Sequence, residues 1–263
     1  MNKNQKIKKE KTKTETSHID EKLPLTTHLE ELRSRLIKMI TCVGVVFCFC
    51  YWQADKIFNF ISAPLYALLP KSSTMTMLKL TEGFVTEFKL AFLSAIFFSM
   101  PFLLYHIWQF IVPGLYPNEK KYLGSFIIFS SILFFLGAAF AYYIVFPFGF
   151  KFFLTYVNDK VAATLSISWY LTFVTQMMLA FGLVFELPVF TLFLAKLGLV
   201  TSEMLRKYRR YAIVIIFIVA AILTPPDAIS QCLMAIPLLI LYEVSIYVAK
   251  AFGKKKVTDE NTD

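Results

Sequence analysis

Residues 122–150 read YLGSFIIFSSILFFLGAAFAYYIVFPFGF and contain no Asp, Glu, Lys or Arg. The hydrocarbon core of a bilayer is about 30 Å thick, so a helix of about 20 apolar residues can cross it with its backbone groups bonded internally. The stretch does not alternate between apolar and polar residues, as the strands of an outer-membrane barrel would. It therefore indicates an all-α membrane protein.

The rest of the chain repeats this pattern. Only 17% of the 263 residues are charged and 57% are hydrophobic, with a mean hydropathy of +0.60, whereas soluble domains carry about 25% charged residues. The apolar runs predict six transmembrane helices, over residues 37–54, 88–110, 122–147, 169–196, 210–223 and 228–249. Residues 224–227 leave so short a loop that the fifth and sixth helices are expected to form a short antiparallel hairpin.

The positions of Lys and Arg predict the topology. With six spans, the N-terminal segment, the second and fourth loops and the C-terminal segment together hold 21 Lys and Arg, and the loops on the other side hold six. Positive loops stay in the cytoplasm, so both termini are expected there. Arg209 and Arg210 belong to this inside-facing charge. We therefore attribute the net charge of +9 to the basic residues of the cytoplasmic segments, and no nucleic-acid partner is expected.

Composition predicts three segments. Residues 1–22 form a disordered basic cytoplasmic tail, residues 23–250 a six-helix transmembrane domain, and residues 251–263 a polar cytoplasmic tail. A cleaved signal peptide is the alternative for the first span, because basic residues precede an apolar stretch. No small-x-small cleavage pattern follows that stretch, so a retained span is expected.

The chain offers little support for catalysis. It has no HExxH, GxSxG or P-loop motif, so neither an enzyme nor a cofactor is expected. Cys42, Cys48, Cys50 and Cys232 form no CxxC pair, and we interpret them as buried apolar thiols and not as a metal or redox site.

Residues 27–35 (THLEELRSR) precede the first span. Leucines recur there at helical spacing and predict a short amphipathic helix along the cytoplasmic interface. Thr27 and Glu30 have the spacing of a capping box. For Glu31, the residues alone favour an ion pair with Arg35 one helical turn later, and a binding role remains open.

Three further acidic residues occupy distinctive positions. Glu119 follows Pro117 in the second loop, where its carboxylate would stabilise the first turn of the next helix. Glu186 lies inside the fourth predicted span, where a carboxylate costs at least about 2.5–3.5 kcal/mol on insertion scales and is expected to face a groove. Pro188 should kink the helix at this level. Asp227 is the predicted N-cap of the sixth span.

Together these motifs resemble one family, the TatC subunits of the twin-arginine protein translocase. The matching segments are HLEELR at 28–33, SAPL at 62–65, FIVPGLYPNEKK at 110–121, FELP at 185–188, LTPPDAISQ at 223–231 and AIPLLILYE at 235–243. The resemblance covers approximately residues 24–250. It implies a glove-like bundle whose concave face looks into the membrane, either the bacterial inner membrane or an organellar one.

The resemblance also implies where the signal peptide of a folded cargo protein binds. Its paired arginines would be received on the cytoplasmic side by Glu31 and Glu119, with Arg33 in the same motif as Glu31. A carboxylate pair suits arginine because each guanidinium can form forked, charge-assisted hydrogen bonds. Glu186 would lie in the membrane-facing concavity.

Four other positions take their expected roles from the resemblance. Thr224 and Gln231 match the site where the single-helix partners TatA and TatB dock. Pro64 matches the extracytoplasmic proline of the family, and Asp227 lies on the same side of the membrane.

The expected function is therefore that of a receptor and scaffold in a multi-copy complex in the lipid bilayer, which exports folded proteins at the expense of the proton motive force. The alternative is an ion-coupled transporter of a small solute in which Glu186 carries a proton. An intramembrane enzyme is a third class, but the sequence shows no nucleophile and base at suitable spacing.

Overall fold

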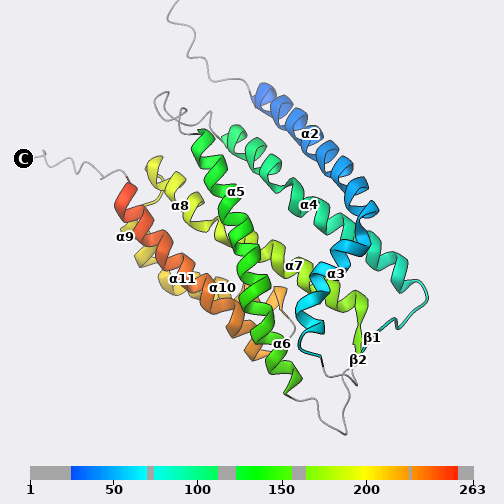
Figure 1. The fold of residues 1–263 in the computed structure, drawn as a ribbon. Helices are drawn as coiled ribbons and strands as arrows, with labels where there is room; N and C mark the ends of the chain where they lie inside the picture. Colours follow the sequence, from blue (N-terminus) through cyan, green and yellow to red (C-terminus); the bar gives the residue numbers. More distant parts are fainter. Residues whose placement is uncertain (1–24, 70–73, 112–122, 156–163, 225–226, 254–263) are drawn as a thin grey trace, which may run out of the picture. The chain divides into compact units, whose positions relative to one another are not determined.

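The computed structural model describes residues 25–69, 74–111, 123–155, 164–224 and 227–253 (Figure 1). The predicted N-terminal tail, most of the predicted C-terminal tail and Glu119 lie outside these ranges. The chain divides into two compact units, residues 1–41 and 42–263.

The described part of the first unit is the beginning of helix α2 (Leu25–Trp52). The expected short amphipathic helix is not a separate element, because α2 runs without a break from Leu25 into the first predicted span. No proline occurs in α2, and its first glycine is Gly44, so nothing in residues 25–43 interrupts the helix. Thr27 is already the third helical residue, which makes the predicted capping box wrong.

The second unit contains the end of α2 and the remaining elements. These are α3 (Ala54–Tyr66), β1 (Thr74–Thr76), α4 (Glu82–Ile111), α5 (Leu123–Phe140), the π-helical turn η3 (Ala141–Val145), α6 (Phe146–Leu154), β2 (Thr164–Ser166), α7 (Ile167–Phe185), α8 (Leu187–Lys196), α9 (Ser202–Lys207), α10 (Arg209–Leu223) and α11 (Ala228–Phe252).

Within the described ranges, five segments are long and apolar enough to cross a membrane, and with them the chain is a multi-pass, helical membrane protein. They are Leu29–Trp52, Glu82–Phe110, Gly124–Leu154, Ile167–Lys196 and Ala228–Phe252. The predicted fifth span corresponds to α10, which has 15 residues and is shorter than the roughly 20 residues that a membrane helix usually needs.

Two of these segments are not uniform α-helices. In the third, η3 interrupts the α-helical hydrogen bonding between α5 and α6. In the fourth, α7 ends at Phe185 and α8 begins at Leu187, with Pro188 in the first turn of α8. The kink predicted from Pro188 is therefore confirmed, and Glu186 occupies the turn between the two helices.

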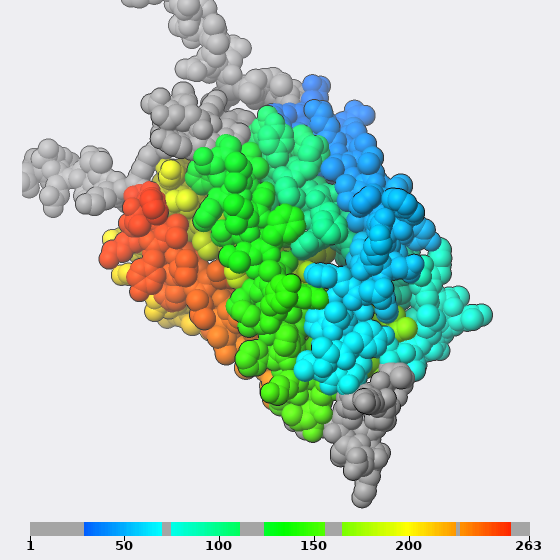
Figure 2. Space-filling view, in the orientation of Figure 1, coloured from blue at the N-terminus to red at the C-terminus, as the bar shows by residue number. Residues whose placement is uncertain are grey.

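The closest helix packing joins α5 to α7. A Cβ atom added at Gly137 in α5 would lie 2.5 Å from the carbonyl oxygen of Phe181, and one added at Gly182 in α7 would lie 2.5 Å from the Phe134 ring. Glycines let two membrane helices approach in this way. Figure 2 shows one face of the molecule, on which α5, η3 and α6 form a continuous green band beside α3 and α4.

Outside the helices, β1 and β2 form a two-stranded parallel ladder that pairs Thr74 with Thr164 and Thr76 with Ser166. The ladder joins the segment before α4 to the segment before α7. These two spans are thereby fixed to each other at one end.

The cysteines correct one expectation. Cys50 is buried, but Cys48 and Cys232 are exposed on the protein surface. Apolar residues of a membrane protein face lipid as readily as protein, so apolar character alone does not predict burial. The described residues contain no group of His, Cys, Asp or Glu that could hold a metal ion.

Candidate functional site

In the first unit, Glu31 forms the local ion pair predicted from its spacing. The Arg35 Nε donates a 3.0 Å hydrogen bond to Glu31 Oε1, one helical turn away, and Arg33 and Glu30 are exposed. Glu119 lies outside the described residues, so the structure leaves the joint role of Glu31, Arg33 and Glu119 as a prediction. The Arg35 guanidinium group thus holds the Glu31 carboxylate in one orientation.

Glu186 is a buried acid in the second unit. Both of its carboxyl oxygens are inaccessible, and none of the described residues gives either oxygen a hydrogen bond of regular geometry. The Ser130 side chain lies beside the carboxyl group, and its oxygen accepts a 3.1 Å hydrogen bond from Trp108 Nε1.

The surroundings of Glu186 are largely apolar. Trp108, which Ser130 contacts, belongs to a hydrophobic cluster formed by α4, α5 and α8, with Phe134, Val189 and Phe193 among its other buried members. Buried polar groups in proteins are nearly always hydrogen-bonded, and acids inside membrane segments usually have a functional role. Glu186 is therefore available to accept a hydrogen bond from a group that enters this part of the bundle.

Three polar residues of the hairpin are bonded within the chain, and one of them, Gln231, joins α11 to α10. Asp227 Oδ1 accepts a 2.7 Å hydrogen bond from the Ser230 backbone N–H, which confirms the predicted N-cap of α11. Gln231 Nε2 donates to the Phe217 carbonyl in α10 at 3.0 Å. Thr224 is buried, and its hydroxyl donates to the Ala220 carbonyl at 2.8 Å. Both Thr224 and Gln231 thus have structural partners within the chain, and their predicted docking role stays a prediction.

Pro64 lies inside α3 and removes a helical hydrogen bond. Because proline has no backbone N–H, the carbonyl of Phe60, four residues earlier, loses its usual donor. The Tyr142 hydroxyl donates to this carbonyl at 2.6 Å, and the Tyr142 and Phe60 rings stack with their centroids 4.8 Å apart. Pro64 therefore creates the acceptor that attaches α3 to η3.

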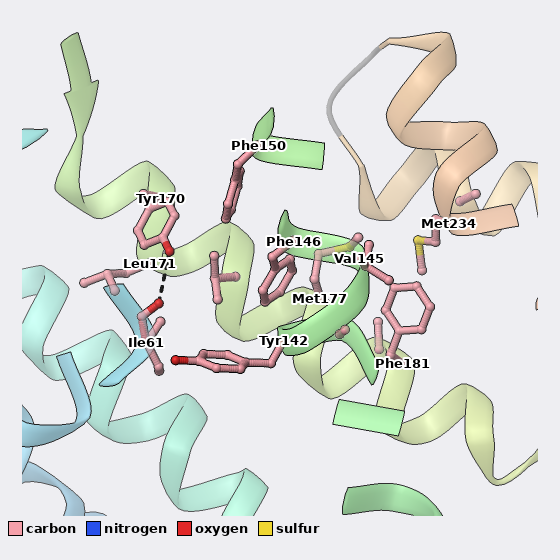
Figure 3. Close-up of a cluster of buried hydrophobic side chains, with 14 of the residues drawn as sticks. Ile61, Tyr142, Val145, Phe146, Phe150, Tyr170, Leu171, Met177, Phe181 and Met234 are labelled. Atoms are coloured by element: carbon pink, nitrogen blue, oxygen red, sulfur yellow. Dashed lines mark hydrogen bonds between the residues drawn. The ribbon is translucent and has the colours of Figure 1, made fainter. Parts of the chain in front are cut away.

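A second tyrosine binds the same turn of α3. The Tyr170 hydroxyl, from α7, donates a 3.0 Å hydrogen bond to the Ile61 carbonyl (Figure 3). Tyr170 is almost completely buried in the main hydrophobic cluster, where Phe146, Phe150 and Met177 surround the same region. Neither tyrosine was predicted from the sequence, although a proline inside a helix signals an unpaired carbonyl four residues earlier.

Glu82 is another residue that the sequence analysis missed. One carboxylate oxygen accepts hydrogen bonds from the backbone N–H groups of Leu78 and Lys79, and the other accepts from the Ser166 hydroxyl and the Ser168 N–H. Four donors on one carboxylate reinforce the β1–β2 ladder. No local pattern around Glu82 identifies the two serines, which lie more than 80 residues away.

Arg209, which the sequence predicts to be one of the charges that keep its loop in the cytoplasm, also forms an ion pair within the second unit. Its guanidinium forms a 2.6 Å ion pair with Glu243 in α11. Tyr242 donates a 2.8 Å hydrogen bond to the Leu205 carbonyl in α9. These contacts fasten the segment before α10 to the C-terminal helix.

Comparison with known proteins identifies the family. Residues 27–237 match the family described as Sec-independent protein translocase protein (TatC). A TatC protein from Desulforapulum autotrophicum is 46% identical over 93% of this chain and 90% of its own length. The TatC protein from Escherichia coli is 39% identical over 92% of this chain and 94% of its own length.

A solved structure shows the same fold. The crystal structure of a twin-arginine translocase receptor, TatC, superposes with a TM-score of 0.79 at 38% identity and covers 84% of this chain and 97% of that one. These descriptions favour protein translocation over the transport of a small solute. The family match over most of the length, the identity to these relatives and the shared fold show that the chain belongs to the TatC family.

Proposed function

We propose that this chain is the receptor subunit of a twin-arginine translocase, which binds the signal peptide of a folded cargo protein and assembles its partner subunits for export. The observation that carries the proposal is the match of residues 27–237 to TatC, together with the fold shared with a TatC receptor. Like that family, the chain would be a transport protein of the bacterial inner membrane and would have no catalytic site.

The proposed membrane arrangement has six spans and both termini in the cytoplasm. In it α10 is the short fifth span and pairs with α11, and the bundle has the glove-like concavity implied by the family. Residues 1–22 and 251–263 would be cytoplasmic tails on a transmembrane domain of residues 23–250. The Lys and Arg distribution supports this orientation.

Glu31, Arg33 and Glu119 are proposed to form the cytoplasmic site for the paired arginines. The pairing of Glu31 with Arg35 supports this role, because an arginine of the signal peptide could replace Arg35 as the partner of a carboxylate that is already oriented. Breaking an i, i+4 pair costs only about 0.2–0.5 kcal/mol. Two forked contacts to carboxylates repay that cost, and lysine has no planar group to form them.

The apolar segment of the signal peptide would then enter the bundle near Glu186. A carboxyl group without an internal hydrogen-bond partner gains more from a polar contact with an entering peptide than a satisfied group would. TatA-like and TatB-like partner helices would dock at the hairpin near Thr224 and Gln231, in a multi-copy assembly driven by the proton motive force.

The test is site-specific photocrosslinking of the full chain in membranes to a radiolabelled twin-arginine precursor. Photoreactive residues at positions 31 and 119 should capture the precursor, and a precursor with a Lys-Lys signal should not be captured. Glu30 is exposed and adjacent to Glu31, so position 30 serves as the matched control. Equal capture of the Arg-Arg and Lys-Lys precursors would refute the assigned site.

Mutation provides an independent check of the same residues. Glu31→Ala combined with Glu119→Ala should abolish capture from a third cytoplasmic position while the protein still inserts into the membrane. Undiminished capture by this double variant would mean that other residues bind the signal.

A further inference from the structure

A cavity of about 340 Å³ opens between α3, α4 and α7. Its walls are apolar, with Ile57 and Ile61 from α3, Leu93 and Phe97 from α4, and Met178 and Leu179 from α7. Its volume falls within the roughly 300–1,000 Å³ that ligand pockets usually have. Phe60, whose carbonyl is held by Tyr142, also lines it, so the tyrosine contacts fix one wall.

The lining of the cavity offers few hydrogen-bond partners to water. Ser94 and Thr175 supply the hydroxyl groups of the lining, and the Thr175 hydroxyl already donates to the Leu171 carbonyl at 2.6 Å. Apolar cavities without several polar partners stay dry. Because α4 and α7 belong to membrane-spanning segments, the apolar molecules available at the opening are the acyl chains of lipids.

One charged residue, Lys56, completes the lining. It lies in the first turn of α3, is exposed, and takes part in no ion pair within the described ranges. A lysine can lay its methylene stem along an apolar surface and keep its ammonium group at the polar edge. Lys56 and the apolar walls therefore complement a molecule that has an apolar tail and an anionic head.

We propose that this cavity binds one acyl chain of a membrane phospholipid, with the lipid phosphate contacted by Lys56. The lipid would fill the space between α3 and the two spans and would thereby support the wall formed by Phe60 and Ile61. This inference depends on the membrane placement of the helices. It does not depend on signal-peptide binding, so it can fail while the proposed receptor function stands.

The first experiment maps the lipid on the purified full-length protein. A phosphatidylglycerol with a diazirine in its acyl chain is added in detergent and irradiated, and labelled peptides are identified by mass spectrometry. Adducts are expected within residues 93–98 and 175–179, and an excess of unlabelled phosphatidylglycerol should remove them. Labelling restricted to other surfaces of the helices would overturn the proposal.

Variants then test the apolar cavity and the Lys56 contact separately. Met178→Trp should fill the cavity and abolish the adducts, and Ile57→Phe serves the same purpose if Met178→Trp does not give a monodisperse protein. Lys56→Gln should weaken labelling by phosphatidylglycerol about fivefold, the usual effect of one basic residue at an anionic membrane surface.

The matched controls lie on exposed positions away from the cavity. Ile132→Trp adds the same ring to the surface of α5, and Lys151→Gln removes a surface charge from α6; both should label like the wild type. Wild-type labelling in the cavity-filling variant and in Lys56→Gln together would overturn the proposal.

The competing occupant is the apolar segment of a cargo signal peptide. A photoreactive residue at Phe98, on the rim of the cavity, should capture radiolabelled lipid in proteoliposomes that contain no precursor. Capture of an added precursor with no capture of lipid would assign the cavity to cargo and refute the lipid site.

Discussion

The hydroxyl group of Tyr142 donates a 2.6 Å hydrogen bond to the carbonyl of Phe60, which Pro64 leaves without its helical donor. A helix-disrupting residue in α3 and a polar group in the third span thus satisfy each other. Neither would be favourable alone, since an unpaired carbonyl or hydroxyl buried in an apolar region costs free energy.

Tyr142→Phe should therefore destabilise the protein by about 1–3 kcal/mol, the usual cost of leaving a buried polar group unsatisfied. Thermal unfolding of the purified chain in detergent measures the effect. In a Pro64→Ala background the restored N–H can serve the Phe60 carbonyl, so the same Tyr142→Phe change should cost less. Tyr143→Phe is the control, because Tyr143 is exposed. Additive effects of the two changes would contradict the coupling.

Gly137→Ala should destabilise the contact between α5 and α7 by about 1–3 kcal/mol, as overpacking of a tight core does. The new methyl group would lie 2.5 Å from the backbone oxygen of Phe181, which cannot move without displacing α7. At Gly44 nothing lies within 4 Å, so Gly44→Ala should be neutral or stabilising. Equal melting temperatures for the two alanine variants would rule out the close approach.

Glu82→Gln should loosen the connection between the segments before α4 and α7. The amide group keeps one acceptor oxygen, so part of the four-donor arrangement is lost, and bonds to a charged acceptor contribute about 1.5–3 kcal/mol. Hydrogen exchange measured by mass spectrometry should accelerate at least about tenfold in peptides covering residues 74–82 and 164–170. Glu87→Gln, at an exposed position of α4, should leave both peptides unchanged. Unaltered exchange in Glu82→Gln would show that the β1–β2 ladder is sufficient.

Glu186→Gln should separate stability from function. Because both carboxyl oxygens lack a hydrogen-bond partner in the described structure, a neutral amide should leave the melting temperature unchanged or raise it, while export of a twin-arginine precursor falls. Glu203→Gln, at an exposed position of α9, should alter neither. A lower melting temperature with normal export would show that the Glu186 carboxyl group is a structural element.

The features predicted correctly from the sequence depend on neighbours along the chain. The N-cap at Asp227, the kink at Pro188 and the pair of Glu31 with Arg35 each involve residues within one helical turn. The apolar runs located the five segments that are long enough to cross a membrane for the same reason, because span length is a property of the local sequence.

The features that sequence reasoning missed join distant segments. Tyr142 and Phe60 are 82 residues apart, and Glu82 and Ser166 are 84 residues apart. Nothing in one sequence distinguishes these tyrosine and glutamate side chains from others like them until the helices are packed. Likewise, Cys48 and Cys232 could not be assigned to the protein surface, because lipid-facing and protein-facing positions are equally apolar.

The π-helical turn η3 has a consequence for the angular register of the third span. A π-turn contains one residue more than an α-helical turn, and one residue corresponds to about 100° of rotation in an α-helix. The faces of α5 and α6 are thus offset around a common axis. A single additional residue in η3 therefore turns the face that α6 presents to its neighbours by about 100° from the one that an unbroken α-helix would present.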